Sequence, residues 1–213
     1  MTDNRHEDAF LSGAYGLRDL PSAMAFYDEW AGEYDTRMEE VLGYVAPRQM
    51  AEHLARFVPD RGAEILDAGC GTGLTSHYLS ALEFSIFDGI DLNKAMLDHA
   101  QRRGIYRDLI HADLTKPLDL ETASYDAVIS SGTFTLGHVG AEPIPELVRV
   151  LRPGGVLGCT VHRDIWEPKG FAETFDTYER QNVLVAIERV AGEFFTGLGE
   201  TALYCVFRKG TEI

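Results

Sequence analysis

The sequence predicts an α/β fold: a doubly wound, mainly parallel sheet of seven strands, with a C-terminal antiparallel hairpin and an N-terminal helical cap. Short apolar segments that end in polar residues alternate with amphipathic helical segments between residues 62 and 210. Three glycines, Gly69, Gly71 and Gly73, directly follow the first apolar segment and precede a helical one. The length of 213 residues fits one domain, 1–213, rather than two.

The N-terminal residues are predicted to lie outside this alternation. Residues 1–21 are polar and contain glycine, which is typical of a flexible tail. Residues 22–58 predict the helical cap, in which Phe26, Trp30 and Tyr34 recur every four residues and line one helix face. Pro47 would open a second helix, whose buried side carries Met50, Ala51, Leu54, Phe57 and Val58.

The core, residues 62–210, is predicted to alternate between strands and helices. The predicted strands are 63–67, 84–92, 109–112, 126–130, 156–161, 185–195 and 202–207. The predicted helices are 74–82, 93–103, 144–151 and one that carries Phe171, Phe175 and Tyr178. Residues 152–155 would end the third helix, and residues 197–199 would join the last two strands as a hairpin. A ligand crevice is expected at the carboxyl ends of the parallel strands.

The glycine loop predicts a nucleoside-containing cofactor. Its glycines allow a tight turn and would bring backbone N–H groups against a ligand at the start of a helix. Asp91 ends the next strand, 24 positions after Asp67, where it would accept hydrogen bonds from ribose hydroxyls. NAD is disfavoured because its fingerprint needs a small residue where Leu74 stands. The loop also lacks the Gly-Lys-Ser/Thr sequence of an ATP-hydrolysing P-loop.

The pattern D-x-G-x-G-x-G at residues 67–73 resembles motif I of the class I S-adenosylmethionine-dependent methyltransferases, whose fold is Rossmann-like. The resemblance covers about residues 25–210 and implies S-adenosylmethionine as the cofactor, with S-adenosylhomocysteine as its product. It implies that Asp67 and Gly69 hold the methionine end, that Asp91 binds the ribose and that Asp113 binds the adenine amino group. The other cofactor-binding residues that it implies are Ala68, Cys70, Gly71, Leu92, Met96, Leu114, Ser130 and Ser131, with Leu92 and Leu114 on either side of the adenine.

Further motifs resemble the methyltransferase-like proteins named after the Williams-Beuren syndrome region. These motifs are residues 27–35, with the pattern YD-x-x-A-x-x-YD at their centre, and residues 43–44, 104–107 and 132–139. The resemblance implies that the first of them closes over the cofactor as a lid, so that Tyr27 and Tyr34 approach its methionine portion. One departure is Asp88, in a strand that is more usually apolar throughout, and it puts the register of that strand in doubt.

Two histidines are candidates for a general base. His138 follows the fourth predicted strand and His162 follows the fifth, so both are expected on the crevice side. A base would assist methyl transfer to an oxygen or a protonated nitrogen, whereas a carboxylate or thiolate acceptor needs none. The predicted function is therefore transfer of a methyl group to a small-molecule acceptor, most simply at O or N. The alternative is a non-catalytic module that binds the cofactor and regulates a protein partner.

Several of these residues also have ordinary structural interpretations. Asp67 would cap the loop, Asp91 would cap the following helix, and Asp113 would simply end a strand. The aromatic stripe of the cap would pack in a core, and Cys70 would be a small packing residue. A histidine on a loop is often no more than an ordinary polar residue.

The amino-acid composition of the chain limits which partners, metals and compartments are expected. Asp plus Glu number 34 against 19 Lys plus Arg, a formal net charge of −15, so the long-range field repels nucleic acid and none is expected as a partner. The three cysteines lie far apart, without zinc-site or disulfide spacing, so we expect no metal and a reduced, cytoplasmic chain. No apolar run approaches the ~20 residues that cross a bilayer, so no membrane role is expected. The oligomeric state stays open.

Overall fold

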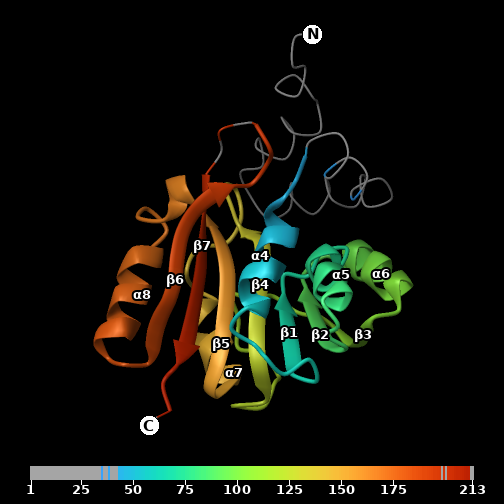
Figure 1. Cartoon of the computed structure of the whole chain (residues 1–213), viewed down its shortest axis with the longest axis horizontal. Helices are drawn as coiled ribbons and strands as arrows, with labels where there is room; N and C mark the ends of the chain where they lie inside the picture. Colours follow the sequence, from blue (N-terminus) through green and yellow to red (C-terminus); the bar gives the residue numbers. More distant parts are fainter. Residues whose placement is uncertain (1–34, 36–37, 39–42, 198, 200, 212–213) are drawn as a thin grey trace.

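The computed structural model describes residues 35, 38, 43–197, 199 and 201–211. Its centre is a seven-stranded sheet with the order β3-β2-β1-β4-β5-β7-β6 (Figure 1). The strands are β1 (Glu64–Ala68), β2 (Ile86–Asp91), β3 (Tyr106–His111), β4 (Tyr125–Phe134), β5 (Leu151–His162), β6 (Leu184–Glu193) and β7 (Thr201–Lys209). Strands β1 to β5 pair in parallel, and β7 runs antiparallel between β5 and β6. The predicted mainly parallel sheet with a C-terminal antiparallel hairpin is confirmed.

Helices cover both faces of this sheet. They are α4 (Ala46–Ala55), α5 (Leu74–Ala81), α6 (Lys94–Arg103), α7 (Ile144–Val150) and α8 (Phe171–Arg180), with a short 3-10 turn η3 (Arg163–Ile165) after β5. Local sequence explains their ends. The Asn93 side chain accepts a hydrogen bond from the Met96 N–H and caps α6, and Gly104, with a φ of +66°, ends it.

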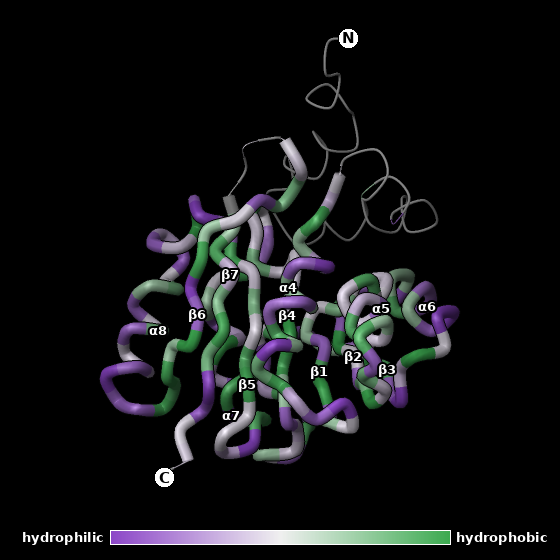
Figure 2. Tube along the Cα trace, in the orientation of Figure 1, coloured by the Kyte–Doolittle hydropathy of each residue, from purple (hydrophilic) through white to green (hydrophobic). Residues whose placement is uncertain are grey.

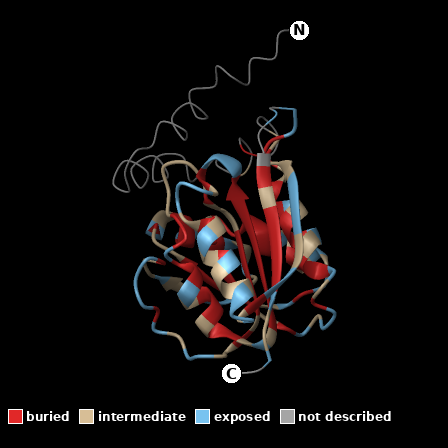
Figure 3. Cartoon of the chain, turned by 90° about the vertical axis from the view of Figure 1, so that its left-hand side faces the viewer, coloured by how far each residue is buried: buried red, intermediate tan, exposed pale blue. Residues whose placement is uncertain are grey.

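Two apolar layers hold the helices to the sheet. Side chains of a strand alternate between its faces, so Ile65 of β1 points to one layer and Leu66 to the other. Helices α4 and α5 pack on the first face, and α7 and α8 pack on the second. Figure 2 shows the apolar residues concentrated along the strands, and Figure 3 shows the central strands buried between helices with exposed outer surfaces. Within the described residues, no helix is long and apolar enough to cross a membrane.

Several boundaries differ from the predicted ones, among them those of α4, β5 and β3. Helix α4 ends at Ala55, so Phe57 and Val58 follow it rather than belong to it, and the helix covers the sheet itself through its contacts with β4, β5 and β7. Strand β5 begins at Leu151 because residues 152–155, predicted as a turn, form an irregularity within the strand. Strand β3 begins at Tyr106, three residues before the predicted start, because the edge of β2 gives it backbone partners.

The register of β2 is settled by the partners of Asp88. This buried carboxylate accepts hydrogen bonds from the Arg107 guanidinium, at 2.6 and 3.0 Å, and from the Tyr125 hydroxyl at 2.8 Å. A buried charge is tolerated when it is paired and hydrogen-bonded in this way. Asp67 of β1 pairs with Gly89 of β2, so Asp91 stands at the carboxyl end of the strand, as the sequence predicts.

Candidate functional site

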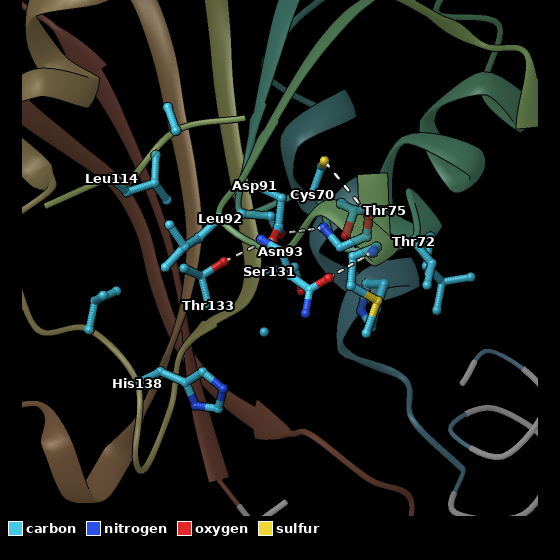
Figure 4. A pocket seen from close by; sticks show the side chains of 18 of the residues that line it. Cys70, Thr72, Thr75, Asp91, Leu92, Asn93, Leu114, Ser131, Thr133 and His138 are labelled. Carbon is cyan, nitrogen blue, oxygen red and sulfur yellow. Dashed lines mark hydrogen bonds between the residues drawn. The ribbon is translucent and has the colours of Figure 1, made fainter. Parts of the chain in front are cut away.

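A pocket lies at the carboxyl ends of β1, β2, β3 and β4, where the sequence predicts a ligand crevice (Figure 4). The glycine loop that joins β1 to α5 forms one wall, and the segment from Ser131 to Val139 forms another. The lining residues are Tyr44, Pro47, Gly69, Cys70, Gly71, Thr72, Leu74, Thr75, Asp91, Leu92, Asn93, Met96, Ala112, Asp113, Leu114, Thr115, Ser131, Gly132, Thr133, His138 and Val139. Side chains from segments far apart in the chain therefore face one cavity.

The glycine loop is bound tightly to the end of β2. The N–H groups of Gly69 and Cys70 donate to the Ile90 carbonyl at 2.8 and 2.9 Å, and the Gly71 N–H donates to an Asp91 carboxylate oxygen at 2.8 Å. The expectation that the N–H groups of the loop face a ligand is therefore wrong for these three residues. What Gly71 offers the pocket is space, since a side chain at its Cα would meet nothing within 4 Å.

Asp91 is the most firmly oriented carboxylate of the pocket wall. One oxygen accepts from the Gly71 N–H, and the other accepts from the Asn93 N–H, both at 2.8 Å. Burial raises the pKa of this carboxyl, and the two N–H donors partly oppose that rise. Asn93 provides the side-chain cap of α6, so Asp91 does not have the capping role that is its ordinary structural interpretation. Each of its oxygens keeps a further lone pair for a ligand.

Asp67 lies behind the loop rather than on the pocket wall. One of its oxygens accepts hydrogen bonds from the Ser76 hydroxyl at 2.6 Å and from the Tyr106 hydroxyl at 2.8 Å. The other oxygen is buried and has no partner among the described residues. Burial is the main cause that raises the pKa of Asp67, to about 6, and the two hydroxyl donors oppose it.

Asp113, Leu92, Leu114 and Met96 all line the pocket, near the ends of β2 and β3. One Asp113 oxygen accepts from the backbone N–H of Thr115 at 2.8 Å and from its hydroxyl at 2.7 Å. Figure 4 shows Leu92 and Leu114 on the same side of the cavity, with His138 well away from them. The residues that sequence reasoning assigned to the adenosine end are thus brought together.

The serines after β1 and β4 have different positions. The Ser130 hydroxyl is buried and donates to the Ala68 carbonyl at 2.7 Å, so both residues lie within the sheet and outside the pocket lining. Ser131 lines the pocket, and its buried Oγ has no partner among the described residues. A buried hydroxyl of this kind is satisfied when a bound molecule supplies a polar atom. Thr133 occupies the space that a side chain at position 69 would need, since a Cβ at Gly69 would lie 2.2 Å from the Thr133 hydroxyl oxygen.

The two candidate histidines are separated by the structure. The Nδ1 atom of His138 lies 2.9 Å from the Leu136 carbonyl oxygen and 2.8 Å from the Thr135 hydroxyl, and the ring lines the pocket. Since a carbonyl only accepts, Nδ1 carries the proton of the neutral ring and Nε2 carries its lone pair. Burial lowers the pKa of His138. His162 is buried outside the pocket lining, stacked on Phe194 with ring centres 5.7 Å apart.

Sequence reasoning missed several residues of the pocket wall. Tyr27 and Tyr34 lie outside the described residues, whereas Tyr44 lines the pocket and its ring packs on Phe195 at 5.1 Å. Asn93, Thr72 and Thr75 also line it. Asn93 could have been found in the sequence from its position two residues after Asp91, and Thr72 from its position inside the glycine loop. No sequence signal marks Thr75, whose polar side chain faces the pocket from the first turn of α5.

The pocket fits S-adenosylmethionine in its polar chemistry. Asp91 presents carboxylate lone pairs for ribose hydroxyls, and Leu92 and Leu114 supply apolar surface for a base. The orphaned Ser131 Oγ and the side-chain-free space at Gly71 belong to residues that line the same pocket. These features agree with a nucleoside joined to a small polar group.

Known proteins support the same assignment. Residues 65–155 match the model of a family described as "Methyltransferase domain". Human methyltransferase-like protein 27 is 37% identical over 155 residues, which are 71% of this chain and 62% of that protein. An 18S rRNA (guanine-N(7))-methyltransferase from Bos taurus is 41% identical over 71 residues, 33% of this chain and 25% of that protein. The chain thus spans less than two thirds of the length of either relative.

A solved structure shares the fold. The crystal structure of a putative S-adenosyl-L-methionine-dependent methyltransferase from Methanococcus maripaludis has a TM-score of 0.66 and 15% identity, and the match covers 87% of this chain and 94% of that one. Glycine loop and domain match together point to one class: the chain is similar to the class I S-adenosylmethionine-dependent methyltransferases, and S-adenosylmethionine is the cofactor of that class. Within it, the chain is similar to methyltransferase-like protein 27, in agreement with the Williams-Beuren resemblance.

Proposed function

We propose that this protein catalyses methyl transfer from S-adenosylmethionine to a small-molecule acceptor, at an oxygen or a nitrogen atom. The observation that carries the proposal is the Asp91 carboxylate, which the Gly71 and Asn93 N–H groups orient on the pocket wall. We assign the ribose hydroxyls to Asp91, the adenine to Leu92, Met96, Asp113 and Leu114, and the methionine portion to Ser131 and the loop at Gly69, Cys70 and Gly71. The proposed unit is a single domain in a cytoplasmic chain, whose three cysteines are buried and free of disulfides.

Three residues of the cofactor set that the sequence predicts act indirectly in this proposal. Asp67, Ala68 and Ser130 lie behind the wall, where hydrogen bonds join them to α5, β3 and β4. They support the loop from within the sheet. Tyr27 and Tyr34 stay predicted contacts with the methionine portion, and the lid to which they belong lies outside the described residues.

The cofactor supplies an electrophilic methyl group on a sulfonium, and the protein supplies alignment and a place for the proton. Alignment of the acceptor with the methyl group can lower a barrier by about 7–11 kcal/mol. His138 lines the pocket, and the Leu136 carbonyl fixes its tautomer with the lone pair on Nε2. We assign His138 the removal of the acceptor proton as general base, while the carbonyl keeps Nδ1 protonated and the ring oriented. His162, stacked in the core, has no part in this step.

A small acceptor is favoured over nucleic acid by the net charge of −15, which repels a polyphosphate. The similarity to an rRNA methyltransferase favours RNA as the second candidate. Transfer of a labelled methyl group into a small-metabolite extract and, separately, into purified cellular RNA distinguishes the two. Label in the metabolite fraction that rises in proportion to the protein supports the proposal. Label in RNA alone contradicts the small acceptor, and cofactor binding without transfer into either fraction points to the non-catalytic module.

S-adenosylhomocysteine and S-adenosylmethionine are each expected to raise the melting temperature of the cofactor-free protein. A ligand that binds only the native state adds RT ln(1 + [L]/Kd), about 2.7 kcal/mol at a hundredfold excess over Kd. Differential scanning fluorimetry over a ligand series measures the rise, with adenosine monophosphate as the control nucleotide. A melting temperature that stays constant with both ligands would contradict cofactor binding.

Asp91→Ala is expected to weaken binding of S-adenosylhomocysteine by about 1.5–3 kcal/mol, because hydrogen bonds to a charged group are lost. Isothermal titration calorimetry measures the loss. The matched control is Asp98→Ala, which removes an exposed carboxylate from α6 outside the pocket lining. Equal affinity of Asp91→Ala and the wild type would show that the ribose is not held by Asp91.

A further inference from the structure

The glycine loop is braced from outside the pocket by a charged contact that the catalytic proposal does not use. Thr72, a buried lining residue of the loop, donates its hydroxyl hydrogen to an Asp35 carboxylate oxygen at 2.5 Å. Arg103, the last residue of α6, donates from Nε to the Thr72 carbonyl oxygen at 2.6 Å. The same guanidinium pairs through Nη2 with the other Asp35 oxygen. Asp35, Arg103 and Thr72 thus form a closed ring of contacts.

Backbone geometry makes room for this ring. Gly73 has a φ of +84°, and a Cβ there would lie 3.1 Å from Arg103 Cδ and 2.9 Å from a ring carbon of Tyr106. A side chain at position 73 would therefore push both residues off the loop. Because Gly73 has none, Arg103 reaches Thr72, and Tyr106 reaches Asp67 behind the loop. Two side chains, one on each side of the α6–β3 connection, thus brace Thr72 of the loop and Asp67 at the end of β1.

The contacts divide the loop into two parts that are held differently. Residues 69–71 are tied to β2 by N–H groups that bond to the Ile90 carbonyl and to Asp91. Thr72 is tied instead to Arg103 and Asp35, through both its carbonyl oxygen and its hydroxyl. The Arg103 and Asp35 side chains are 20% and 35% exposed, so solvent screens their attraction only in part. The charged pair therefore fixes the segment where the loop enters α5.

We propose that the Arg103–Asp35 pair is a clamp that positions Thr72 and the end of the glycine loop for cofactor binding, an inference that rests on the proposed function. Arg103 and Asp35 are positioning residues, since they act on the pocket through Thr72. The planar guanidinium suits this role because it donates to a carbonyl and to a carboxylate at once, whereas a lysine ammonium presents a single point charge. Loss of the clamp lets Thr72 and the first turn of α5 move, and the pocket loses preorganisation.

The test compares full-length variants for affinity toward S-adenosylhomocysteine by calorimetry. Arg103→Gln is expected to weaken binding by about tenfold, because hydrogen bonds from a charged donor are lost. Asp35→Asn should weaken it less, and the double variant should be no weaker than Arg103→Gln, because the two residues act as one pair. Arg103→Lys should restore part of the affinity. The matched control, Arg102→Gln, removes the neighbouring exposed arginine, and it should bind as the wild type does.

Two further measurements separate the clamp from a general loss of stability and from independent effects of the two residues. The melting temperature of each variant without ligand shows whether a change is one of global stability; a lower melting temperature with wild-type affinity would overturn the clamp. Affinity of Arg103→Gln within twofold of the wild type, or additive effects in the double variant, would also overturn it. If the wild type does not bind S-adenosylhomocysteine, the proposed function fails, and hydrogen exchange of residues 70–75 then tests the clamp alone. Faster exchange in Arg103→Gln supports it, and equal exchange contradicts it.

Discussion

His138→Gln is expected to lower the rate of methyl transfer to an oxygen or nitrogen acceptor by about 10²- to 10⁴-fold, the usual contribution of a general base. The glutamine amide can still donate to the Leu136 carbonyl, which now accepts from the His138 ring at 2.9 Å, but it cannot take up a proton. Affinity for S-adenosylhomocysteine should stay within twofold of the wild type, since His138 is assigned to the acceptor. Transfer of a labelled methyl group into the metabolite fraction measures the rate, and calorimetry measures the affinity.

The dependence of the methyl-transfer rate on pH provides a second test of His138 as the general base. Burial lowers the pKa of His138 below its usual 6.5, so the neutral ring already predominates at pH 7. The wild-type rate should therefore rise with pH up to that lowered pKa and stay flat above it, and His138→Gln should lack the rise. His99→Gln, a change at a half-buried histidine of α6 outside the pocket lining, is the control. Equal rates in His138→Gln and the wild type would remove His138 from the mechanism and leave an acceptor that arrives already ionised.

The sheet and the placement of Asp91 could be predicted because both depend on local patterns. Apolar runs that end in polar residues mark parallel strands, and an acidic residue at such an end reaches the crevice wherever the next helix begins. The predicted position of Asp91 at the end of the second strand is confirmed, and a hydrogen bond of 2.8 Å joins it there to Gly71 of the loop. Local patterns also predicted the hairpin, through the glycines between β6 and β7.

The direction in which a side chain points could not be predicted where partners come from distant residues. Asp67 follows the family pattern of a cofactor contact, yet the Tyr106 hydroxyl, 39 positions later, holds its carboxylate behind the loop. Asp88 is a charged residue in an apolar strand, and the hydrogen bonds that it accepts from Arg107 and Tyr125 explain its position. His162 follows a predicted strand just as His138 does, and the position of Phe194 shows that its ring is stacked in the core. Such contacts depend on tertiary packing, and spacing along the chain does not encode them.

The pKa of Asp67 differs between the folded and the unfolded protein because folding buries its carboxyl group. Both hydroxyl donors, Ser76 and Tyr106, bond to one oxygen, and the other oxygen is buried without a partner among the described residues. Burial raises the pKa of Asp67 from its usual 3.8 to about 6. A folded-state pKa above the unfolded value means that the folded protein holds the proton more tightly. The stability that this proton contributes is fully present below pH 3.8 and is lost as the pH rises through about 6.

Asp67→Asn is therefore expected to stabilise the cofactor-free protein at pH 7 and to have little effect at pH 4. The gap between a pKa of 3.8 and one of about 6 corresponds to about 3 kcal/mol, which the wild type loses on ionisation and the asparagine variant does not. The asparagine oxygen can accept from both Ser76 and Tyr106, because a carbonyl oxygen has two lone pairs. Urea unfolding at pH 4, 5, 6 and 7 measures the difference, and Asp98→Asn, on the exposed side of α6, is the control. A free-energy difference between Asp67→Asn and the wild type that does not change with pH would show that Asp67 is ionised in the fold throughout this range, and that water hydrogen-bonds its second oxygen.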